Sequence, residues 1–520
     1  MKNLLLVPML LLSLTALCQA PCQLDQTFAT NGKLVLHNGR SAEAIALQDD
    51  GKLVLALNYF GSYTLQISRF DPNGNLDQSF GTAGIVTLDI GDDATKAFSC
   101  LVYNSKIFIG GNAYDPGGAR AFIAAMDLNG QMINSFGTNG IIKFDFNPKI
   151  NTFSDMIVDA NGNIYILGNE SYNVGCILKL DANTGNLVSS FDNDGFVTFN
   201  YPSGISYELN DINLDNNGDV LIAGTRKLSS SATDYSQLLV KVNGSSGSFV
   251  NSFGSNGVGY YQYSTTVPVH AHHVLIDDQN NYFLSGYAYE NNDFDILVAK
   301  VNPTNGTLNT SFGNNGFVKH DILGQSVDEI PYSALILPDN RMLLGGHLGD
   351  SNNDTTYFAL FMLNPDGTRD LNFAPNAYLR HSFDLYSASS ASCMAVDLDN
   401  KEIFLGGFAR TCSNGVCGLM KSGIANYTFE PGAALSTTSF SSQGLEIYPN
   451  PISAGATLFI NSNDVLEATL QDLYGRIIDA SFDQSNSSIS IPTISDGLYI
   501  LSCKNKNDQV MTKKILVSNN

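Results

Sequence analysis

The segment His270-Ala271-His272-His273 is the best candidate for metal chemistry in this 520-residue chain. On a β-strand His270 and His272 would share one face, and two imidazoles there could hold a metal ion. No carboxylate or cysteine recurs nearby at a spacing typical of metal ligands. We therefore expect these histidines to pack between sheets or to lie in a solvent-exposed loop, and we predict no metal and no cofactor.

Clusters of Asp, Asn and Gly, such as Asp215-Asn216-Asn217-Gly218, superficially resemble calcium loops. A calcium loop needs about six oxygen ligands and usually a distal glutamate. These clusters lack both, so turn chemistry explains them. The chain also has no GxSxG, no Walker loop and no HExxH motif. It contains no tryptophan, which excludes the repeated Asp box of sialidases. No catalytic residue is predicted.

A short sequence motif that contains one phenylalanine recurs along the chain. This repeat indicates which structural elements hold the candidate side chains in place. It reads LDQSFGTAGIV at 76–86 and LNTSFGNNGFV at 308–318. The copies repeat with a period of about 57 residues, longer than that of leucine-rich or ankyrin repeats. We interpret each phenylalanine as a buried structural plug between neighbouring sheets, and the seven are Phe28, Phe80, Phe136, Phe191, Phe253, Phe312 and Phe373.

Each repeat contains four predicted strands. The stretch AIALQDDGKLVLALN, which starts at Ala44, is an apolar run, a polar turn and a second apolar run, as in a β-hairpin. A third run, LQISRFD, and the strand GIVTLDI complete the unit. Seven four-stranded units are typical of a β-propeller. The sequence therefore predicts an all-β fold with a seven-bladed propeller over residues 19–428.

The two ends of the repeat array are complementary. The first copy has a fourth strand but no hairpin before it, and the last hairpin, from Met394, has no fourth strand after it. Pairing Lys33–His37 with the segment near Cys417–Lys421 would close the ring and remove two open sheet edges.

The repeats resemble the bacterial delta-60 repeat, whose consensus contains a D-G hairpin, a G-x-LD-x-SFG phrase and a G-x-V strand. Asp77, Ser79, Phe80, Gly81 and Gly84 match that phrase. The resemblance covers roughly residues 23–421. It implies a propeller-like fold and brings no defined activity with it.

Residues 1–18 are predicted to be a secretory signal peptide, with Lys2 before an apolar run and cleavage before Gln19. The alternative, a lipoprotein lipidated on Cys18, requires a small residue before that cysteine, and a leucine stands there. No other apolar stretch reaches the roughly 20 residues that span a bilayer. The net charge of −22 argues against nucleic-acid binding. We expect a mature chain that is soluble or surface-attached.

Removal of Cys18 with the signal peptide would leave seven of the eight cysteines. Cys412 and Cys417 are close enough in sequence to bridge across one turn, and an oxidising compartment would permit a disulfide between them. The others are scattered singly, mostly beside apolar runs, where a buried free thiol is expected.

The C-terminal part has a different pattern. Residues 429–444 have the composition of a linker, and residues 445–520 are predicted to form a small β-sandwich. This part resembles the C-terminal sorting domain of the type IX secretion system, found in Gram-negative bacteria of the Bacteroidota. The resemblance implies the secretion machinery as a partner, passage through the outer membrane, and release or anchoring at the surface; an ordinary accessory sandwich is the alternative. The matching residues are Tyr448, Pro449, Asn450, Pro451, Gly475, Arg476, Gly497, Tyr499, Lys513 and Lys514.

The activity is far less constrained than the architecture. We expect a monomeric, non-catalytic surface propeller that binds or scaffolds an extracellular glycan or protein. The alternatives are a propeller hydrolase or lyase that acts on an extracellular polymer, or a spacer without a ligand. An acid–base pair of carboxylates in the central funnel would support the enzyme. Aligning the repeats singles out no Asp or Glu that departs from the repeat pattern.

Overall fold

The structure is a computed structural model, and every element in the part of the chain it describes is a β-strand. The chain divides into two compact units, Met1–Gly432 and Ala433–Asn520. The described residues are 22–36, 39–59, 64–145, 150–171, 174–200, 205–228, 234–324, 327–350, 355–374, 377–383, 386–413, 416–429, 447–450, 452–460, 465–472, 477–478, 480–494, 497–505 and 510–518. The predicted signal peptide therefore lies outside them.

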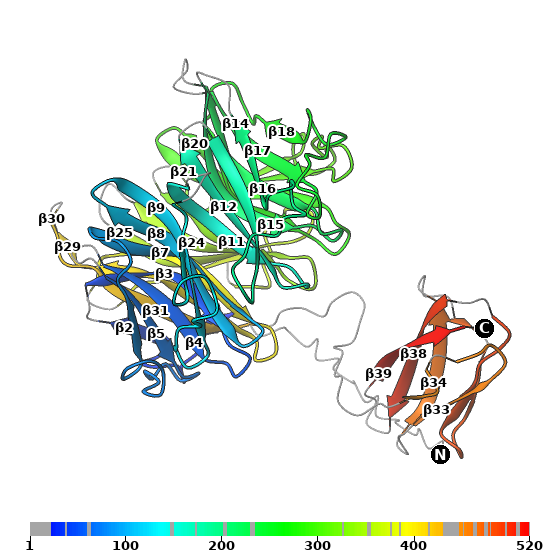
Figure 1. Ribbon diagram of the computed structural model, residues 1–520. Helices are drawn as coiled ribbons and strands as arrows, with labels where there is room; N and C mark the ends of the chain where they lie inside the picture. Colours follow the sequence, from blue (N-terminus) through cyan, green and yellow to red (C-terminus); the bar gives the residue numbers. More distant parts are fainter. Residues whose placement is uncertain are drawn as a thin grey trace, which may run out of the picture. The chain divides into compact units, whose positions relative to one another are not determined.

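Five four-stranded sheets follow one another along the first unit, and in each sheet consecutive strands pair antiparallel (Figure 1). This order is the one that the hairpin pattern of the repeats predicts. The sheets contain β3 (Arg40–Leu47), β4 (Leu53–Tyr59), β5 (Leu65–Phe70) and β6 (Ile85–Leu88); β7 (Ala94–Tyr103), β8 (Lys106–Asp115), β9 (Gly118–Asp127) and β10 (Ile141–Lys143); β11 (Thr152–Val158), β12 (Asn163–Ser171), β13 (Val174–Asp181) and β14 (Phe196–Asn200); β15 (Ile205–Leu214), β16 (Val220–Leu228), β17 (Tyr235–Val242) and β18 (Val258–Tyr261); β19 (Val269–Ile276), β20 (Tyr282–Glu290), β21 (Asp293–Val301) and β22 (Phe317–His320).

A nine-stranded sheet follows, and it consists of two meanders joined by one parallel bridge between Thr356 and Ala388. The first meander is β23 (Asp328–Ile336), β24 (Met342–Asp350), β25 (Thr355–Leu363) and β26 (Tyr378–His381). The second is β27 (Ala388–Asp397), β28 (Glu402–Arg410) and β31 (Lys421–Thr428), completed by the N-terminal strands β1 (Gln23–Leu24) and β2 (Lys33–Leu36).

The N-terminal strand β2 pairs antiparallel with β31, so the two ends of the repeat array lie side by side (Figure 1). Lys33 lies opposite Ala425 and Leu36 opposite Ser422. The partner is later in the chain than the expected segment near Cys417–Lys421. The reason is that Cys417 belongs to a separate small hairpin, β29 (Cys412–Ser413) with β30 (Val416–Cys417).

The end of the first unit also differs from the expectation. Phe429, which the composition assigns to a linker, is 4% exposed and belongs to the same apolar cluster as Phe358 and Tyr427. Its N–H donates to the carbonyl of Lys401. The packed structure therefore includes Phe429, and residues 430–444 of the predicted linker lie outside the described part of the chain.

The first strands of the sheets and meanders, called here the inner strands, are β3, β7, β11, β15, β19, β23 and β27. Each contacts the next one, and β27 contacts β3. Every inner strand carries a β-bulge at the same place in its pairing with the second strand, a feature that the sequence pattern did not predict. The residues skipped by the register are Glu43, Phe98, Ser154, Asn210, His272, Tyr332 and Ser392.

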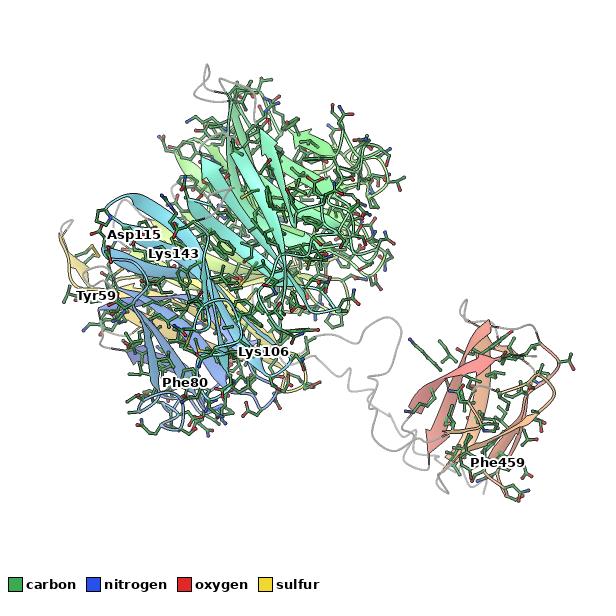
Figure 2. All side chains as sticks on the ribbon, in the orientation of Figure 1. Tyr59, Phe80, Lys106, Asp115, Lys143 and Phe459 are labelled. Carbon is green, nitrogen blue, oxygen red and sulfur yellow. A yellow bond between two sulfur atoms is a disulfide. The ribbon has the colours of Figure 1, made fainter. Side chains whose placement is uncertain are left out.

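The repeat phenylalanines are all buried, with exposed fractions of 0 to 4%. Phe80, labelled in Figure 2, lies under the guanidinium of Arg69 and meets the turn of the next repeat, because a Cβ added to Gly130 would contact its ring at 3.1 Å. The following residue, Gly81, donates its N–H to the carbonyl of Asn129 in that turn. The recurring motif therefore connects this repeat to the next one by two contacts, the packing of the phenylalanine ring and the backbone hydrogen bond of the glycine.

The second unit contains two four-stranded sheets that share one apolar core, as expected for a β-sandwich. Leu458, Leu470, Ile489 and Leu501 are fully buried in it. One sheet has the order β32 (Ile447–Tyr448), β33 (Thr457–Ile460), β37 (Ser488–Ser490) and β36 (Ser481–Asp483). The other has β35 (Ile477–Ile478), β34 (Val465–Asp472), β38 (Gly497–Asn505) and β39 (Val510–Val517).

Candidate functional site

Three adjoining cavities of about 580, 610 and 210 Å³ form one groove in the first unit. The first two share Tyr287, Tyr289 and Phe294 as a wall, and the second and third share Tyr332 and His347. Rings line the groove along its length. We call it the aromatic groove, and its ring-bearing residues are Tyr235, His270, His272, Tyr287, Tyr289, Phe294, Tyr332, His347 and Phe408.

The rings of the groove form a continuous series of contacts. Successive centroids are 5.1 Å apart from Tyr235 to His270, 4.7 Å from His270 to Tyr287 and 5.2 Å from Tyr287 to His272. The series continues over 5.6 Å to Tyr332 and 5.8 Å to His347. Tyr289 and Tyr332 remain 36% and 39% exposed, so ring surface is open to a ligand.

In two other repeats, the residues equivalent to those that border the groove are asparagines whose side chains hydrogen-bond to the backbone of the next inner strand. We call this interaction the asparagine clip. Asn58, near the end of β4, donates from Nδ2 to the carbonyl of Ala97 at 2.8 Å and accepts the N–H of Ala97 at 2.9 Å. It thereby holds the next inner strand. Asn112 accepts the N–H of Phe153 in the same way, at 2.8 Å. At the equivalent position, the second strands that border the groove carry Tyr287, His347 and Phe408.

The residue Pro331 is consistent with the loss of the asparagine clip in this part of the sheet array. It occupies the inner-strand position that in other repeats offers an N–H to the clip, and proline has no N–H to offer. Its carbonyl is used differently, because His272 Nδ1 lies 2.9 Å from it and donates to it. The local sequence has thus exchanged a structural hydrogen bond, from a second strand to the next inner strand, for rings that line the groove.

The surroundings of His272 and His347 favour the neutral form of these two imidazoles. Burial lowers the pKa of His272 to about 4, and the neighbouring His273 and His270 lower it further, against the opposing effect of the Pro331 carbonyl. Burial also lowers the pKa of His347 to about 4. Both side chains are therefore uncharged near neutral pH and offer ring faces and a nitrogen to a ligand.

Carboxylates approach the histidine segment from the preceding sheet, a proximity that sequence spacing did not reveal. His270 Nδ1 lies 3.6 Å from a carboxylate oxygen of Glu208, and His273 Nδ1 lies 3.6 Å from Asp211 Oδ1. Contact with His270 is the main cause that holds the pKa of Glu208 below its usual range. His270 and His272 do not belong to the group of three metal-type ligands found among the described residues.

A second polar set lies on the inner strands, directly after the bulges. Burial raises the pKa of Asp155 on β11 to about 8, and the nearby charge of Asp211 on β15 raises it further. Asp211 Oδ2 also accepts the N–H of Val274 at 2.8 Å. Burial would lower the pKa of His273, but Asp211 outweighs it and the pKa is raised. Asp155 and Asp211 thus occupy the equivalent position after the bulge in two neighbouring repeats, which the alignment of the repeats did not single out.

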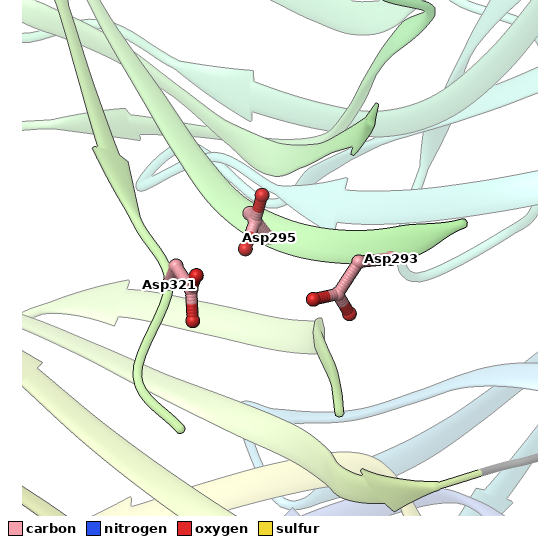
Figure 3. A group of neighbouring side chains, drawn as sticks. All are labelled: Asp293, Asp295 and Asp321. Atoms are coloured by element: carbon pink, nitrogen blue, oxygen red, sulfur yellow. The ribbon is translucent and has the colours of Figure 1, made fainter. Parts of the chain in front are cut away.

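A third set consists of Asp293 and Asp295 on β21 and Asp321 after β22 (Figure 3). One carboxylate oxygen from each lies within 4.8 Å of the others. Asp293 and Asp295 are 2% and 3% exposed, whereas Asp321 is exposed. Sequence reasoning missed this group because its members are joined only by the pairing of β21 with β22.

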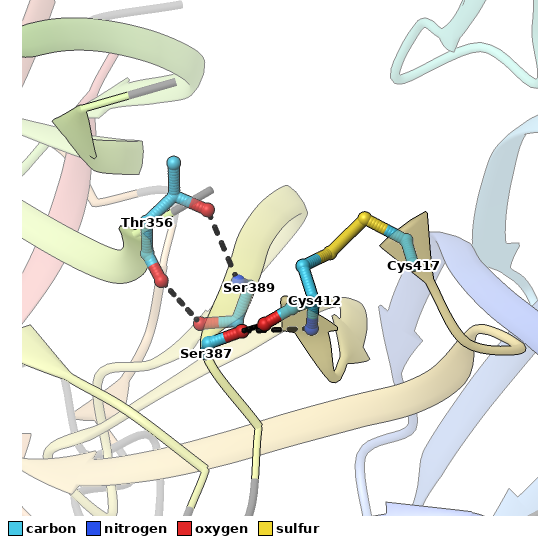
Figure 4. The surroundings of a disulfide bond; sticks show 5 residues. All are labelled: Thr356, Ser387, Ser389, Cys412 and Cys417. Carbon is cyan, nitrogen blue, oxygen red and sulfur yellow. Dashed lines mark hydrogen bonds between the residues drawn. A yellow bond between two sulfur atoms is a disulfide. The ribbon is translucent and has the colours of Figure 1, made fainter. Parts of the chain in front are cut away.

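Cys412 and Cys417 form a disulfide across the β29–β30 hairpin, with an S–S distance of 2.05 Å (Figure 4). Ser387 Oγ anchors this hairpin, because it accepts the N–H of Cys412 at 2.8 Å and donates to the carbonyl of Cys412 at 3.0 Å. The free cysteines Cys22, Cys176, Cys393 and Cys503 are buried, and Cys100 is partly buried.

Of the sorting-signal residues, Asn450 joins the N-terminal segment of the second unit to its last strand by donating from Nδ2 to the carbonyl of Lys514 at 2.9 Å. Tyr448 is 57% exposed and stacks on Phe459. Pro449 follows Tyr448 through a cis peptide bond. Tyr499 is 7% exposed, and Gly497 and Lys513 lie on β38 and β39. Pro451, Gly475 and Arg476 lie outside the described residues.

Two family models match parts of the chain. The secretion system C-terminal sorting domain matches residues 446–518. The Domain of unknown function (DUF5122) beta-propeller matches residues 48–80 and 337–373. No curated protein matches the sequence. No helix that is long and apolar enough to cross a membrane occurs among the described residues.

Solved structures that match the chain share little sequence with it. The extracellular domain of a hybrid two-component system from B. thetaiotaomicron is 10% identical with a TM-score of 0.36; the alignment covers 94% of this chain and 59% of that one, so this chain spans less than two thirds of it. The polysaccharide lyase Uly1 is 10% identical with a TM-score of 0.42, over 78% of this chain and 92% of the lyase. Prolyl oligopeptidase B from Galerina marginata is 9% identical with a TM-score of 0.41, over 90% of this chain and 56% of the peptidase.

Proposed function

We propose that the propeller binds an extracellular glycan in the aromatic groove without changing it chemically. The chain carries a β-propeller and a type IX secretion sorting domain, and the sorting domain directs it to the cell surface or the medium. The observation that carries this proposal is the continuous series of rings from Tyr235 to His347. Sugar rings present C–H faces that pack on aromatic faces, and their hydroxyls hydrogen-bond to tyrosine and histidine.

The charge of the chain narrows the class of glycan. A net charge of −22 repels polyanions, so a neutral or cationic polymer is favoured over a uronate-rich one. The groove itself contains neutral imidazoles, as the lowered pKa values of His272 and His347 require. The lining also contains Glu290, Asp328 and Arg410, so hydroxyl groups of a sugar would meet both neutral rings and charged hydrogen-bond partners.

The proposed scaffold for the groove is a seven-bladed propeller that closes on itself. The support is the pairing of β2 with β31, the contact of β27 with β3, and the hydrogen bond from the N–H of Cys22 to the carbonyl of Phe373. We assign residues 19–429 to this monomeric propeller, the following segment up to residue 444 to a linker, and residues 445–520 to the sorting domain.

An extracellular hydrolase or lyase is the second candidate, and the polar set on the inner strands favours it. Asp155, whose pKa is raised by burial and further by the charge of Asp211, holds a proton beside a second carboxyl group, an arrangement found in acid–base pairs. His273 beside Asp211 adds a further proton carrier. His273 follows His272, which lines the groove, so a polymer bound along the groove would lie near this polar set.

The experiment is to incubate the chain, without its predicted signal peptide, with a panel of bacterial and host-matrix polysaccharides and proteins, and to record both retention and released fragments. Retention of a neutral glycan without fragments supports the proposal. It should weaken about tenfold, or about 1.4 kcal/mol, in Tyr287→Ala. Phe98→Ala removes an exposed ring outside the groove and should leave retention unchanged. Fragments that accumulate with time, and vanish in Asp155→Asn, would establish the enzyme instead.

A further inference from the structure

The acidic group on β21 and β22 is distinct from the aromatic groove, although it shares β21 with it. Asp293 and Asp295 alternate with Phe294, so they lie on the face of the strand opposite the ring that lines the groove. Asp321 follows directly after β22, the strand that pairs with β21. The pairing brings three carboxylates together from two strands, as Figure 3 shows.

The basic side chain of Lys319 contacts this acidic group. Lys319 Nζ lies 2.9 Å from Asp295 Oδ2 and 2.7 Å from Glu290 Oε2, so it is shared between two carboxylates. The second oxygen of Asp295, Oδ1, is buried and accepts no hydrogen bond. A carboxylate that is 97% buried requires compensation for the solvation it has lost.

Glu329 is affected by the same excess of negative charge. It is fully buried, and its Oε2 accepts no hydrogen bond. Burial raises the pKa of Glu329 to about 8, and Asp293 and Asp295 raise it further. Asp295 and Glu329 thus each have a buried carboxylate oxygen without a hydrogen bond, and a cation bound beside Asp295 would compensate the negative charge there.

The β7–β10 sheet provides an internal comparison. Its strand pairing places Gly118, Arg120 and Asp145 at the positions of Asp293, Asp295 and Asp321. There the Arg120 guanidinium lies 3.1 Å from Asp145, and Lys143 contacts Asp115 as Lys319 contacts Glu290 (Figure 2). The β19–β22 sheet keeps the lysine but has a third carboxylate where its counterpart has an arginine.

We propose that Asp293, Asp295 and Asp321 bind a calcium ion. Oxygen ligands of this kind suit a hard divalent cation, and calcium accepts the irregular geometry of two strands and a loop, with water in the remaining positions. Extracellular calcium modules have dissociation constants on the order of 10⁻⁴ to 10⁻³ M, and export of the chain exposes it to such a medium. This inference is independent of the glycan proposal.

The test is the thermal unfolding midpoint and calorimetric titration of the full chain after chelation, with CaCl₂ or MgCl₂ added. Calcium at 5 mM should raise the midpoint, and the titration should give one site. Asp321→Asn, which changes an exposed residue, should lower calcium affinity at least tenfold. Asp115→Asn breaks the matched Lys143 contact and should leave the calcium response unchanged.

Asp295→Arg supplies the sharpest comparison, because it copies Arg120 of the β7–β10 sheet. It should abolish the calcium response while the chain stays folded by circular dichroism. Absence of heat and of a midpoint shift with calcium in the unmodified chain would overturn the proposal, as would an undiminished response in Asp321→Asn. A response to magnesium equal to that of calcium would overturn the assignment of the ion.

Discussion

The imidazole of His272 lies face to face with the phenol ring of Tyr332, with 5.6 Å between the ring centroids and 16° between the planes. Both residues occupy the bulge position of their inner strands, β19 and β23. A bulge re-aims the side chain that it leaves out of the ladder. The stack therefore arises from two equivalent irregularities in neighbouring sheets.

Removal of one ring from this stack should weaken glycan binding while the fold persists. Tyr332→Ala should lower the affinity for the retained polymer about tenfold. Tyr332→Phe keeps the ring and should lower the affinity by less than about threefold. Calorimetric titration with a soluble oligosaccharide measures both. Equal losses in the two variants would contradict stacking as the source of affinity.

The repeat phenylalanines should dominate stability. Phe80→Ala removes a fully buried ring and should lower the free energy of unfolding by about 3–5 kcal/mol. Phe98→Ala removes the same side chain at a site that is 41% exposed and should cost much less. Urea denaturation followed by fluorescence gives both values, and similar losses would refute the role of the phenylalanine as a plug.

The asparagine clip should be costly to remove although it is small. Asn58→Leu would leave the buried N–H and carbonyl of Ala97 without the partners they have at 2.9 and 2.8 Å. Each unpaired group costs about 1–3 kcal/mol, so the free energy of unfolding should fall by at least that amount. The exposed Asn73 in a turn is a matched control, because Asn73→Ala should change stability little.

The buried carboxyl group of Asp155 on the inner strand β11 should make the free energy of unfolding depend on pH. Asp155 binds its proton up to about pH 8 in the folded chain, because burial raises its pKa, whereas the unfolded side chain loses it near its ordinary value of about 4. The folded state thus holds more protons between these limits, and the contribution of Asp155 to stability is lost as pH rises from about 4 to about 8. Asp155→Asn should flatten the midpoint-against-pH curve over this window. An unchanged slope would show that Asp155 does not hold the proton.

The repeat pattern in the sequence predicted the features that all repeats share. It did not predict the features in which single repeats differ, such as the groove. The plugs, the hairpins and the join between the chain ends follow from the spacing of Phe80, Phe136 and their equivalents, because packing between sheets imposes the same residue at the same place. The bulges have no sequence signature, since residues as unlike as Glu43 and Tyr332 occupy them. Without the bulge register, the tyrosines and histidines of the groove cannot be assigned to one surface.

One signal in the sequence pointed to the groove. At one position of the second strand, which follows a glycine in every repeat but the first, the residue is asparagine at 58, 112 and 169 and threonine at 225, but tyrosine, histidine and phenylalanine at 287, 347 and 408. Read as a departure from the repeat, this change marks the border of the groove. The acidic group carries a fainter signal, Asp293-Phe294-Asp295, whose third member becomes visible only through strand pairing.

The bond between the two ends of the array has a kinetic consequence. Ser422 Oγ donates to the carbonyl of Arg40, a partner 382 residues away in the chain, in the same region where β2 pairs with β31. Contacts of such long sequence separation carry a large loop-closure entropy and form late. The sheet that contains both ends is therefore completed only after almost the whole array has been synthesised and has left the ribosome. Until then β2, at the start of the array, lacks its partner strand β31.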